Sequence, residues 1–197
     1  MIYNIFMKNL KVKISEVLIS ELEKKTLDKI TISDITETLG VSRQAFYYHF
    51  FDIYEVVEWI FKEAATKVLN EYGNLDSWKV AAERLMSWCE ENKNFVLNSF
   101  KSVNREYIET FLYSVINPYI RKVVDEESQN YNIVDSQKLF ISEFYTFAFD
   151  SLIIDWIKHD MSVDKNLIIE NAATLTEGDI NKSILNFHEK NNLENEK

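Results

Sequence analysis

The sequence predicts an all-α fold, and three observations support this prediction. Only three glycines and one proline occur among 197 residues, which is too few turn-forming residues for a sheet protein of this size. Apolar residues recur at intervals of three or four along most of the chain, the spacing that places them on one helix face. Because 46% of the residues are hydrophobic, the chain can bury a substantial core.

The first four helices are expected from capping residues and apolar spacing. The first covers about residues 8–26, with its apolar residues on one face. Thr31 can cap a second helix, which Gly40 ends because glycine readily adopts a left-handed conformation. Ser42 can cap a short third helix, RQAFYYHF, and Asp52 can cap a long fourth one.

Only the residues GVS separate the second and third helices. Such a tight link makes two short helices cross steeply, and Ile35, Leu39 and Phe46 are spaced to fill the angle between them. This is a helix-turn-helix pattern, which places its second helix in the major groove of DNA. A plain helical hairpin can show the same apolar spacing, so the exposed side chains have to distinguish the two.

The third helix presents groups that suit the edges of DNA bases once Phe46 is turned inward. Arg43 can bind guanine through two hydrogen bonds, and Gln44 can pair with adenine. The methyl group of Ala45 can contact a thymine methyl group. These residue types favour duplex DNA as the partner.

Hydroxyl groups on the same segment suit phosphate oxygens. They belong to Ser42, Tyr47 and Tyr48. The alternative is that both tyrosines pack against neighbouring helices and that His49 hydrogen-bonds a carbonyl group.

Charge is unevenly distributed along the chain. Residues 1–50 contain seven Lys or Arg against six Asp or Glu, whereas residues 51–197 contain fifteen against twenty-six. The net charge of −10 taken alone argues against a nucleic-acid partner, but the near-neutral first part can still approach phosphate. The asymmetry suggests two functional units, a DNA-binding domain at residues 1–51 and a helical domain at 52–190, followed by a frayed tail at 191–197. The family resemblance given next implies that the second domain has a regulatory and dimerisation role.

The segment from ITISDITETLG to FYYHFFDIYEVVEWIF resembles the DNA-binding domain of the tetracycline-repressor (TetR) family. The match covers about residues 10–65 and is most specific from Gly40 to Phe50. It implies a homodimeric regulator, most often a repressor, which binds a palindromic operator in double-stranded DNA and is released by a small-molecule effector. By motif position it implies DNA contacts from Thr31, Ser33, Ser42, Arg43, Gln44, Ala45, Tyr47, Tyr48 and His49.

Two features narrow this resemblance. Phe51 and Ile53 stand where the family usually has lysines that face phosphate, so we expect Lys29 or lysines of the first helix to supply phosphate contacts. The segment around Trp59 most resembles regulators of dihydroxyacetone kinase operons, which can activate as well as repress, sometimes through a protein co-regulator. The alternatives are therefore an activator, a protein-co-regulated member, or a helical dimeric adaptor that has lost DNA binding.

The remaining residues also indicate helices. Ser77 can cap one, and Pro118 is expected to start another, because proline is tolerated at the first helical position. A long helix, SQKLFISEFYTFAFDSLIIDWIKHDM, follows a polar connector. Ser162 or Asp164 can cap the next helix, and Gly178 interrupts it.

The long helix is apolar on nearly every side, so it is either deeply buried or covered by another chain. Two such helices per subunit would form a four-helix dimer interface, as the resemblance implies. The alternative is a monomer with a large core. The residues expected at the interface are Phe144, Phe147, Leu152, Ile153, Trp156, Leu167 and Ile168.

An effector pocket is expected among aromatic residues of the second part. Aromatic residues at helical spacing can equally form an ordinary core, and no ligand class follows from them. The candidates are Trp59, Trp88, Phe100, Tyr107 and Phe111.

No catalytic constellation is evident. None of the three histidines lies near Cys89, the single cysteine, in the sequence. Asp155 and His159 could be two metal ligands on one helix face, but without companions an exposed pair explains them better. We expect no enzyme, metal site or cofactor.

The cellular compartment is also indicated by composition. A lone cysteine cannot form a disulfide within the chain, which is typical of a reducing compartment. No run approaches the roughly 20 apolar residues of a membrane helix, so we expect a cytoplasmic protein without a membrane partner.

Overall fold

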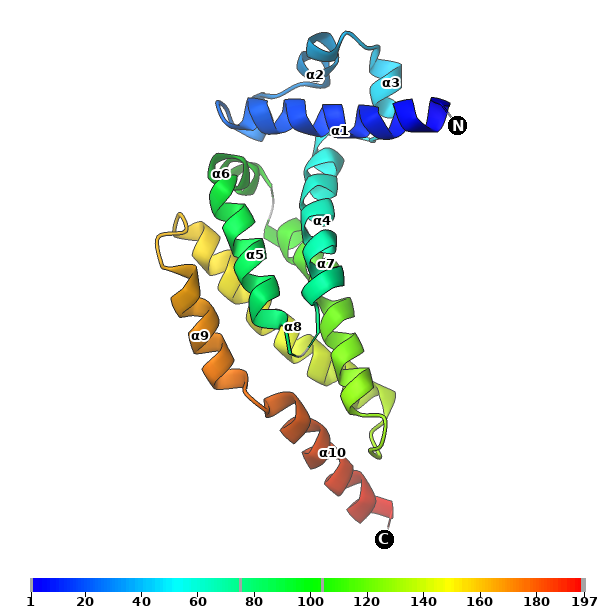
Figure 1. Cartoon of the computed structure of the whole chain (residues 1–197), viewed down its shortest axis with the longest axis vertical. Coiled ribbons are helices and arrows are strands. Elements are labelled where there is room, and N and C mark those ends of the chain that lie inside the picture. Colours follow the sequence, from blue (N-terminus) through cyan, green and yellow to red (C-terminus); the bar gives the residue numbers. More distant parts are fainter. Residues whose placement is uncertain (1, 75, 104, 196–197) are drawn as a thin grey trace. The chain divides into compact units, whose positions relative to one another are not determined.

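The computed structural model describes residues 2–74, 76–103 and 105–195, and these form helices and no strand (Figure 1). This confirms the predicted all-α fold class. Among the residues described, no helix combines the length and the apolarity needed to cross a bilayer.

The chain divides into two compact units. Unit 1 consists of Met1–Ala64 and Cys89–Ile108, and unit 2 of Ala65–Trp88 and Glu109–Lys197. Because each unit combines separate stretches of sequence, three helices, α4, α5 and α7, contain residues of both. The functional division at residue 51 stays a prediction.

Unit 1 begins with a long helix followed by three short elements. They are α1 (Ile2–Leu22), the 3-10 helix η1 (Leu27–Lys29), α2 (Ile32–Leu39) and α3 (Arg43–Tyr47). The unit continues with the first part of α4 (Ile53–Tyr72), the end of α5 (Trp78–Glu91), α6 (Lys93–Ser102) and the start of α7 (Arg105–Glu127). The first helix thus ends earlier than the expected residue 26.

The core of unit 1 is formed by apolar side chains from α1 to α4 and α6. Those that are fully buried include Ile14, Leu18, Leu22, Ile35, Phe46, Val56 and Val96. A side chain of α6 caps the end of α1, because Asn98 Nδ2 donates to the Leu22 carbonyl at 2.7 Å. In addition, the Leu27 amide donates to Ser102 Oγ at 3.2 Å.

Unit 2 contains the end of α4, most of α5 and α7, and three further helices: α8 (Asp135–Lys158), α9 (Lys165–Thr176) and α10 (Asp179–Asn195). One core cluster contains Leu69, Ala81 and Val115. A second contains Val124, Ile141, Tyr145 and Ile184.

One expectation in unit 2 is wrong, that for Pro118, and two others stay predictions. Ser77 directly precedes α5 and its hydroxyl donates to the Tyr72 carbonyl at 2.8 Å, so its role as a side-chain cap stays a prediction. Pro118 lies inside α7; the helix continues through it because Val115 and Val124, on either side, are buried in the two core clusters. The expected frayed tail at 191–197 overlaps the end of α10, which reaches Asn195; its fraying stays a prediction, and residues 196–197 lie outside the described residues.

The start of α9 follows one of the two expected options. Asp164 caps this helix, since its Oδ1 accepts from the Asn166 amide at 2.9 Å. Gly178 separates α9 from α10 with a φ of +74°.

Candidate nucleic-acid interface and an apolar cavity

Local capping interactions define both ends of α2 and the start of α3. Thr31 and Asp34 form a capping box at the start of α2, with side-chain-to-amide distances of 2.8 and 3.2 Å. Gly40 ends α2 in the left-handed region, with φ 64° and ψ 32°. Ser42 Oγ then accepts from the Ala45 amide at 3.2 Å and caps α3. The predicted caps are confirmed.

The packing of Phe46 determines which side chains of α3 face outward. Its ring is fully buried and makes an edge contact with Tyr47 at 5.8 Å between centroids. Arg43 and Gln44 are exposed at the start of the helix, and Arg43 Nη2 donates to Tyr47 Oη at 3.4 Å. The helix therefore presents an arginine and a glutamine side by side to the solvent.

Several predicted phosphate contacts are accessible in unit 1. Tyr47 and Tyr48 are exposed, at 50% and 68% of their surface, and so are Thr31 and Ser42. The two capping hydroxyls accept amide hydrogens, which leaves each O–H free to donate to a phosphate oxygen. Lys29 is exposed at the end of η1.

Other predicted contacts are less accessible. Ser33 and Ala45 are half-buried. His49 Nε2 is buried and has no hydrogen-bond partner in the described part of the chain. Burial, followed by the nearby Lys11 charge, lowers the pKa of His49, so its ring stays neutral at physiological pH. Within the described residues no carbonyl accepts from Nε2, and the DNA contact of His49 stays a prediction.

The lysines around the element are not equivalent. Lys25 is 2.8 Å from Glu21 and 3.7 Å from Asp34, so its charge is partly neutralised. Lys11 Nζ lies 4.9 Å from the centre of the Phe50 ring. The Glu21–Lys25 pair has the four-residue spacing of helical ion pairs, so the sequence alone could have predicted it.

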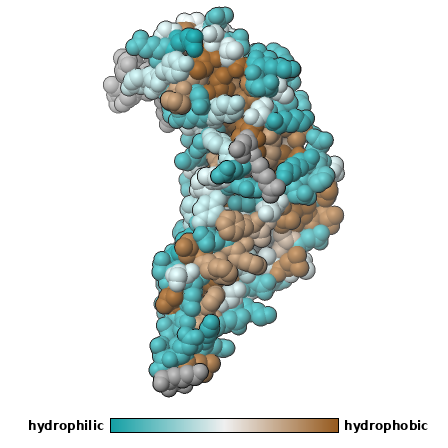
Figure 2. Space-filling model, turned by 180° about the vertical axis from the view of Figure 1, so that it is seen from behind, coloured by the Kyte–Doolittle hydropathy of each residue, from teal (hydrophilic) through white to brown (hydrophobic). Residues whose placement is uncertain are grey.

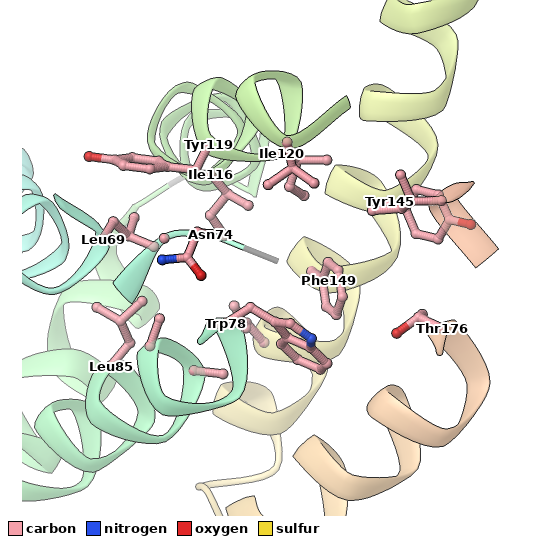
Figure 3. A pocket seen from close by; sticks show the side chains of 16 residues that line it. Leu69, Asn74, Trp78, Leu85, Ile116, Tyr119, Ile120, Tyr145, Phe149 and Thr176 are labelled. Carbon is pink, nitrogen blue, oxygen red and sulfur yellow. The ribbon is translucent and has the colours of Figure 1, made fainter. Parts of the chain in front are cut away.

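A cavity of about 160 Å³ lies within unit 2. Figure 3 shows Trp78 and Phe149 side by side on its wall, with ring centroids 5.4 Å apart. Each lining side chain that the structure describes is uncharged, and most are aliphatic or aromatic, from α4, α5, α7, α8, α9 and α10. A cavity of this size and lining holds a ligand of about the size of benzene.

The polar groups on the cavity wall are mostly occupied within the chain. Tyr119 Oη donates to Asn70 at 2.9 Å, and its hydroxyl points away from the cavity in Figure 3. Thr176 Oγ1 donates to the Ala172 carbonyl at 2.9 Å. Asn74 Oδ1 accepts from the Asp76 and Ser77 amides, both at 3.1 Å. The cavity therefore favours an uncharged, largely apolar ligand.

None of the five aromatic residues expected at a pocket is among those that line this cavity. Trp59 packs on Phe50 in unit 1 at 6.0 Å, and Tyr107 Oη donates to Glu58 at 2.7 Å. Phe111 packs beside the core cluster that contains Leu69, Ala81 and Val115. Trp88 and Phe100 are half-buried. Their role in ligand binding has no support from this cavity.

The residues expected at a dimer interface fall into two groups. Phe144 and Phe147 of α8 are exposed, at 61% and 55%, and Leu152 and Leu167 are also exposed. Trp156 is instead an internal residue at 2% exposure, and its Nε1 donates to the Val163 carbonyl at 2.9 Å. Ile153 lines the apolar cavity, and Ile168 is half-buried.

Phe140 extends this exposed apolar surface and was missed by sequence reasoning. It is 61% exposed and lies one turn before Phe144 on α8. Positions 140, 144 and 147 share one helix face, so the spacing was available in the sequence. Apolar residues also gather in a band on the face shown in Figure 2.

Comparisons with known proteins agree with this architecture. Residues 76–178 match the TetR-type family model described as a transcriptional regulator C-terminal region. The chain is 25% identical over 135 residues to the HTH-type dhaKLM operon transcriptional activator DhaS of Lactococcus lactis subsp. lactis (strain IL1403), covering 68% of this chain and 72% of that protein. A solved structure of a dihydroxyacetone kinase operon activator DhaS has the same fold, with a TM-score of 0.64 and 21% identity over 90% of this chain and 97% of that one.

Proposed function

Because the chain belongs to the TetR family of transcriptional regulators, we propose that it recognises a specific operator in double-stranded DNA through α3. The observation that carries this proposal is the exposed Arg43–Gln44 pair at the start of α3, held by the buried Phe46. Arginine and glutamine are the side chains that bind guanine and adenine through paired hydrogen bonds. The chain is a regulator and not an enzyme.

The regulator acts as a homodimer on a palindromic operator. One α3 contributes few base contacts, and a two-fold pair doubles them. The exposed phenylalanines of α8 support this proposal, because a contiguous apolar surface of this kind is typical of a protein interface.

A small molecule controls the regulator through the apolar cavity of unit 2. The uncharged lining supports a neutral, apolar effector. Control requires that the effector bind one conformation of the chain better than another. Helices α4, α5 and α7 contain residues of both units and are the continuous elements along which such a change would be transmitted.

The family resemblance and the two relatives favour different signs of regulation. Repression relieved by an effector is the commonest mode that the family resemblance implies. Both relatives are named as activators, and this favours activation, with or without a protein co-regulator, as the second candidate.

Selection of bound duplexes from a random DNA library tests the proposed function. The expected result is enrichment of an inverted repeat whose half-sites contain a guanine contacted by Arg43. Recovery of no enriched motif would contradict sequence-specific binding and favour a helical dimeric adaptor that has lost DNA binding. Phe51 stands where the family usually has a lysine that faces phosphate, and its 82% exposure is consistent with that alternative.

A further inference from the structure

A second cavity in unit 2 is lined by α7 and α8 and has a volume of about 440 Å³. Glu109 and Tyr113 lie one turn apart on α7, and Phe147 and Asp150 lie about one turn apart on α8. Phe147 and Ser151, which also line the cavity, are exposed in the single chain. A small molecule can therefore enter from the solvent wherever the proposed dimer leaves this part of α8 uncovered.

One oxygen of the Asp150 carboxyl group is unsatisfied. The residue is only 5% exposed, and its Oδ1 is buried without a hydrogen-bond partner in the described residues. Burying a carboxylate without a partner is costly. A buried polar atom of this kind requires an explanation, and a ligand that supplies the missing charge or donor is one.

The hydroxyl group of Thr146, about one turn earlier on α8, is not the missing donor. Thr146 Oγ1 donates to the Ser142 carbonyl at 2.6 Å and accepts from Asn117 Nδ2 at 3.1 Å. Burial, followed by the negative charge of Glu109, raises the pKa of Asp150 to about 7. The ionisable side chains among the described lining residues include the carboxyl groups of Asp150 and Glu109, and none of them is a lysine or an arginine.

Two aromatic rings complete the lining. Tyr113 and Phe147 stack with ring centroids 5.7 Å apart and an interplanar angle of 30°. Tyr113 Oη donates to Glu143 at 3.2 Å, which fixes the orientation of this ring. The faces of aromatic rings attract organic cations, and their area also suits apolar substituents.

The donor set does not suit a metal ion. In the described residues, no group of three or more His, Cys, Asp or Glu side chains is placed to hold a metal. A buried carboxyl group beside two aromatic rings instead matches the recognition of an alkyl- or arylammonium group.

We propose that this cavity binds a small organic cation, with the Asp150 carboxylate as its counter-ion. The rings of Tyr113 and Phe147 cover the apolar part of the ligand. This site shares no lining residue with the apolar cavity. Its proposed ligand is positively charged, whereas the apolar cavity favours an uncharged ligand.

Phe147 connects this site to the proposed dimer surface. Its ring stacks on Tyr113, and the residue is also part of the exposed apolar face of α8. Ligand binding and dimerisation would therefore both involve Phe147.

Calorimetric titration of the full chain, without DNA, tests the proposal. The probes are benzyltrimethylammonium and uncharged benzyl alcohol, at pH 8, where Asp150 is ionised. We expect the cation to bind about tenfold or more tightly than the alcohol. Asp150→Asn should abolish this preference, and it removes a buried charge, so the variant is expected to fold. Phe147→Ala should weaken binding of the cation through loss of ring contact.

Asp155→Asn is the matched control, because Asp155 lies on the same helix with its side chain 73% exposed, and it should leave the preference unchanged. Equal affinity for the two probes, or an unchanged preference in Asp150→Asn, would overturn the proposal. Cation binding seen only after the dimer is disrupted would also overturn it, since a second copy of the chain would then occupy the cavity. Because no DNA is present, failure here leaves the proposed DNA recognition intact.

Discussion

Arg43 is the side chain on which the proposed DNA recognition depends most. It is exposed at the first position of α3, beside Gln44, and its hydrogen bond to Tyr47 limits the directions that it can take. A preoriented guanidinium group loses less side-chain entropy when it binds a base.

Arg43→Ala is predicted to weaken binding to the selected operator by about 1–3 kcal/mol while changing affinity for random DNA much less. Lys29→Ala, as the control, should weaken both similarly, because a phosphate contact carries no sequence information. Competition binding with the two DNAs measures both variants. Equal losses for Arg43→Ala on all sequences would contradict its role as a base reader.

Asp150 is predicted to make stability depend on pH. Its folded pKa of about 7 lies above the ordinary value of 3.8, so the folded state retains a proton that the unfolded state has lost. The wild type therefore loses stability as pH rises from about 4 to 7. Asp150→Asn should gain stability on the order of 2 kcal/mol over the wild type at pH 8, and little at pH 4.

Chemical denaturation of the full chain at the two pH values measures this difference, with Asp155→Asn as the exposed control. A stabilisation that is the same at pH 4 and pH 8 would show that Asp150 does not titrate in this window.

At the residue scale, local features were predictable and tertiary ones were not. Thr31, Gly40 and Ser42 were identified because a cap depends on neighbours within three or four residues. The burial of His49 Nε2 and of Trp156 depends on residues that pack from elsewhere in the chain. Helical spacing alone does not reveal such packing.

At the scale of the element, the turn between α2 and α3 depends on Gly40. A Cβ atom there would meet no atom of the described residues within 4 Å, so the cost of a side chain is the left-handed backbone alone. Gly178 offers the same test in unit 2, since it also has a positive φ and open space around it.

Gly40→Ala and Gly178→Ala are each predicted to lower the free energy of unfolding by about 1–2 kcal/mol. Only Gly40→Ala should also weaken operator binding, because it strains the element that carries α3. Denaturation and DNA binding of both variants check this. Loss of DNA binding in Gly178→Ala to the same extent would refute the specific role of the turn.

The elements themselves were largely predictable, but their assembly was less so. Pro118 was expected to start a helix, yet the buried valines on both sides keep α7 continuous. The lining of the apolar cavity was missed because Trp78, Tyr119 and Phe149 come from three different helices. A pattern within one helix cannot show which residues of other helices face it.

At the scale of the whole molecule, the exposed phenylalanines of α8 are the basis for the proposed homodimer. Phe144→Glu is predicted to convert the dimer to a monomer, because a charge at the centre of an apolar interface is costly to bury. Phe51→Glu, in unit 1 and also highly exposed, should leave the dimer intact. Analytical ultracentrifugation measures both, and a monomeric wild type would contradict the homodimer.

The overall negative charge explains why composition alone did not indicate DNA as the partner. The chain carries −10 overall, yet the first fifty residues are nearly neutral and contain the helix-turn-helix element. DNA binding by such a protein depends on a few well-placed cations, so it should be sensitive to salt.

The most direct test of sequence-specific recognition is fluorescence anisotropy of the purified chain on labelled DNA from the region upstream of its own gene, titrated with salt and with scrambled DNA as competitor. We predict tight binding that resists the competitor and weakens steeply as salt rises. Binding that is no tighter than to scrambled DNA at every salt concentration would contradict recognition of this region and favour a helical adaptor.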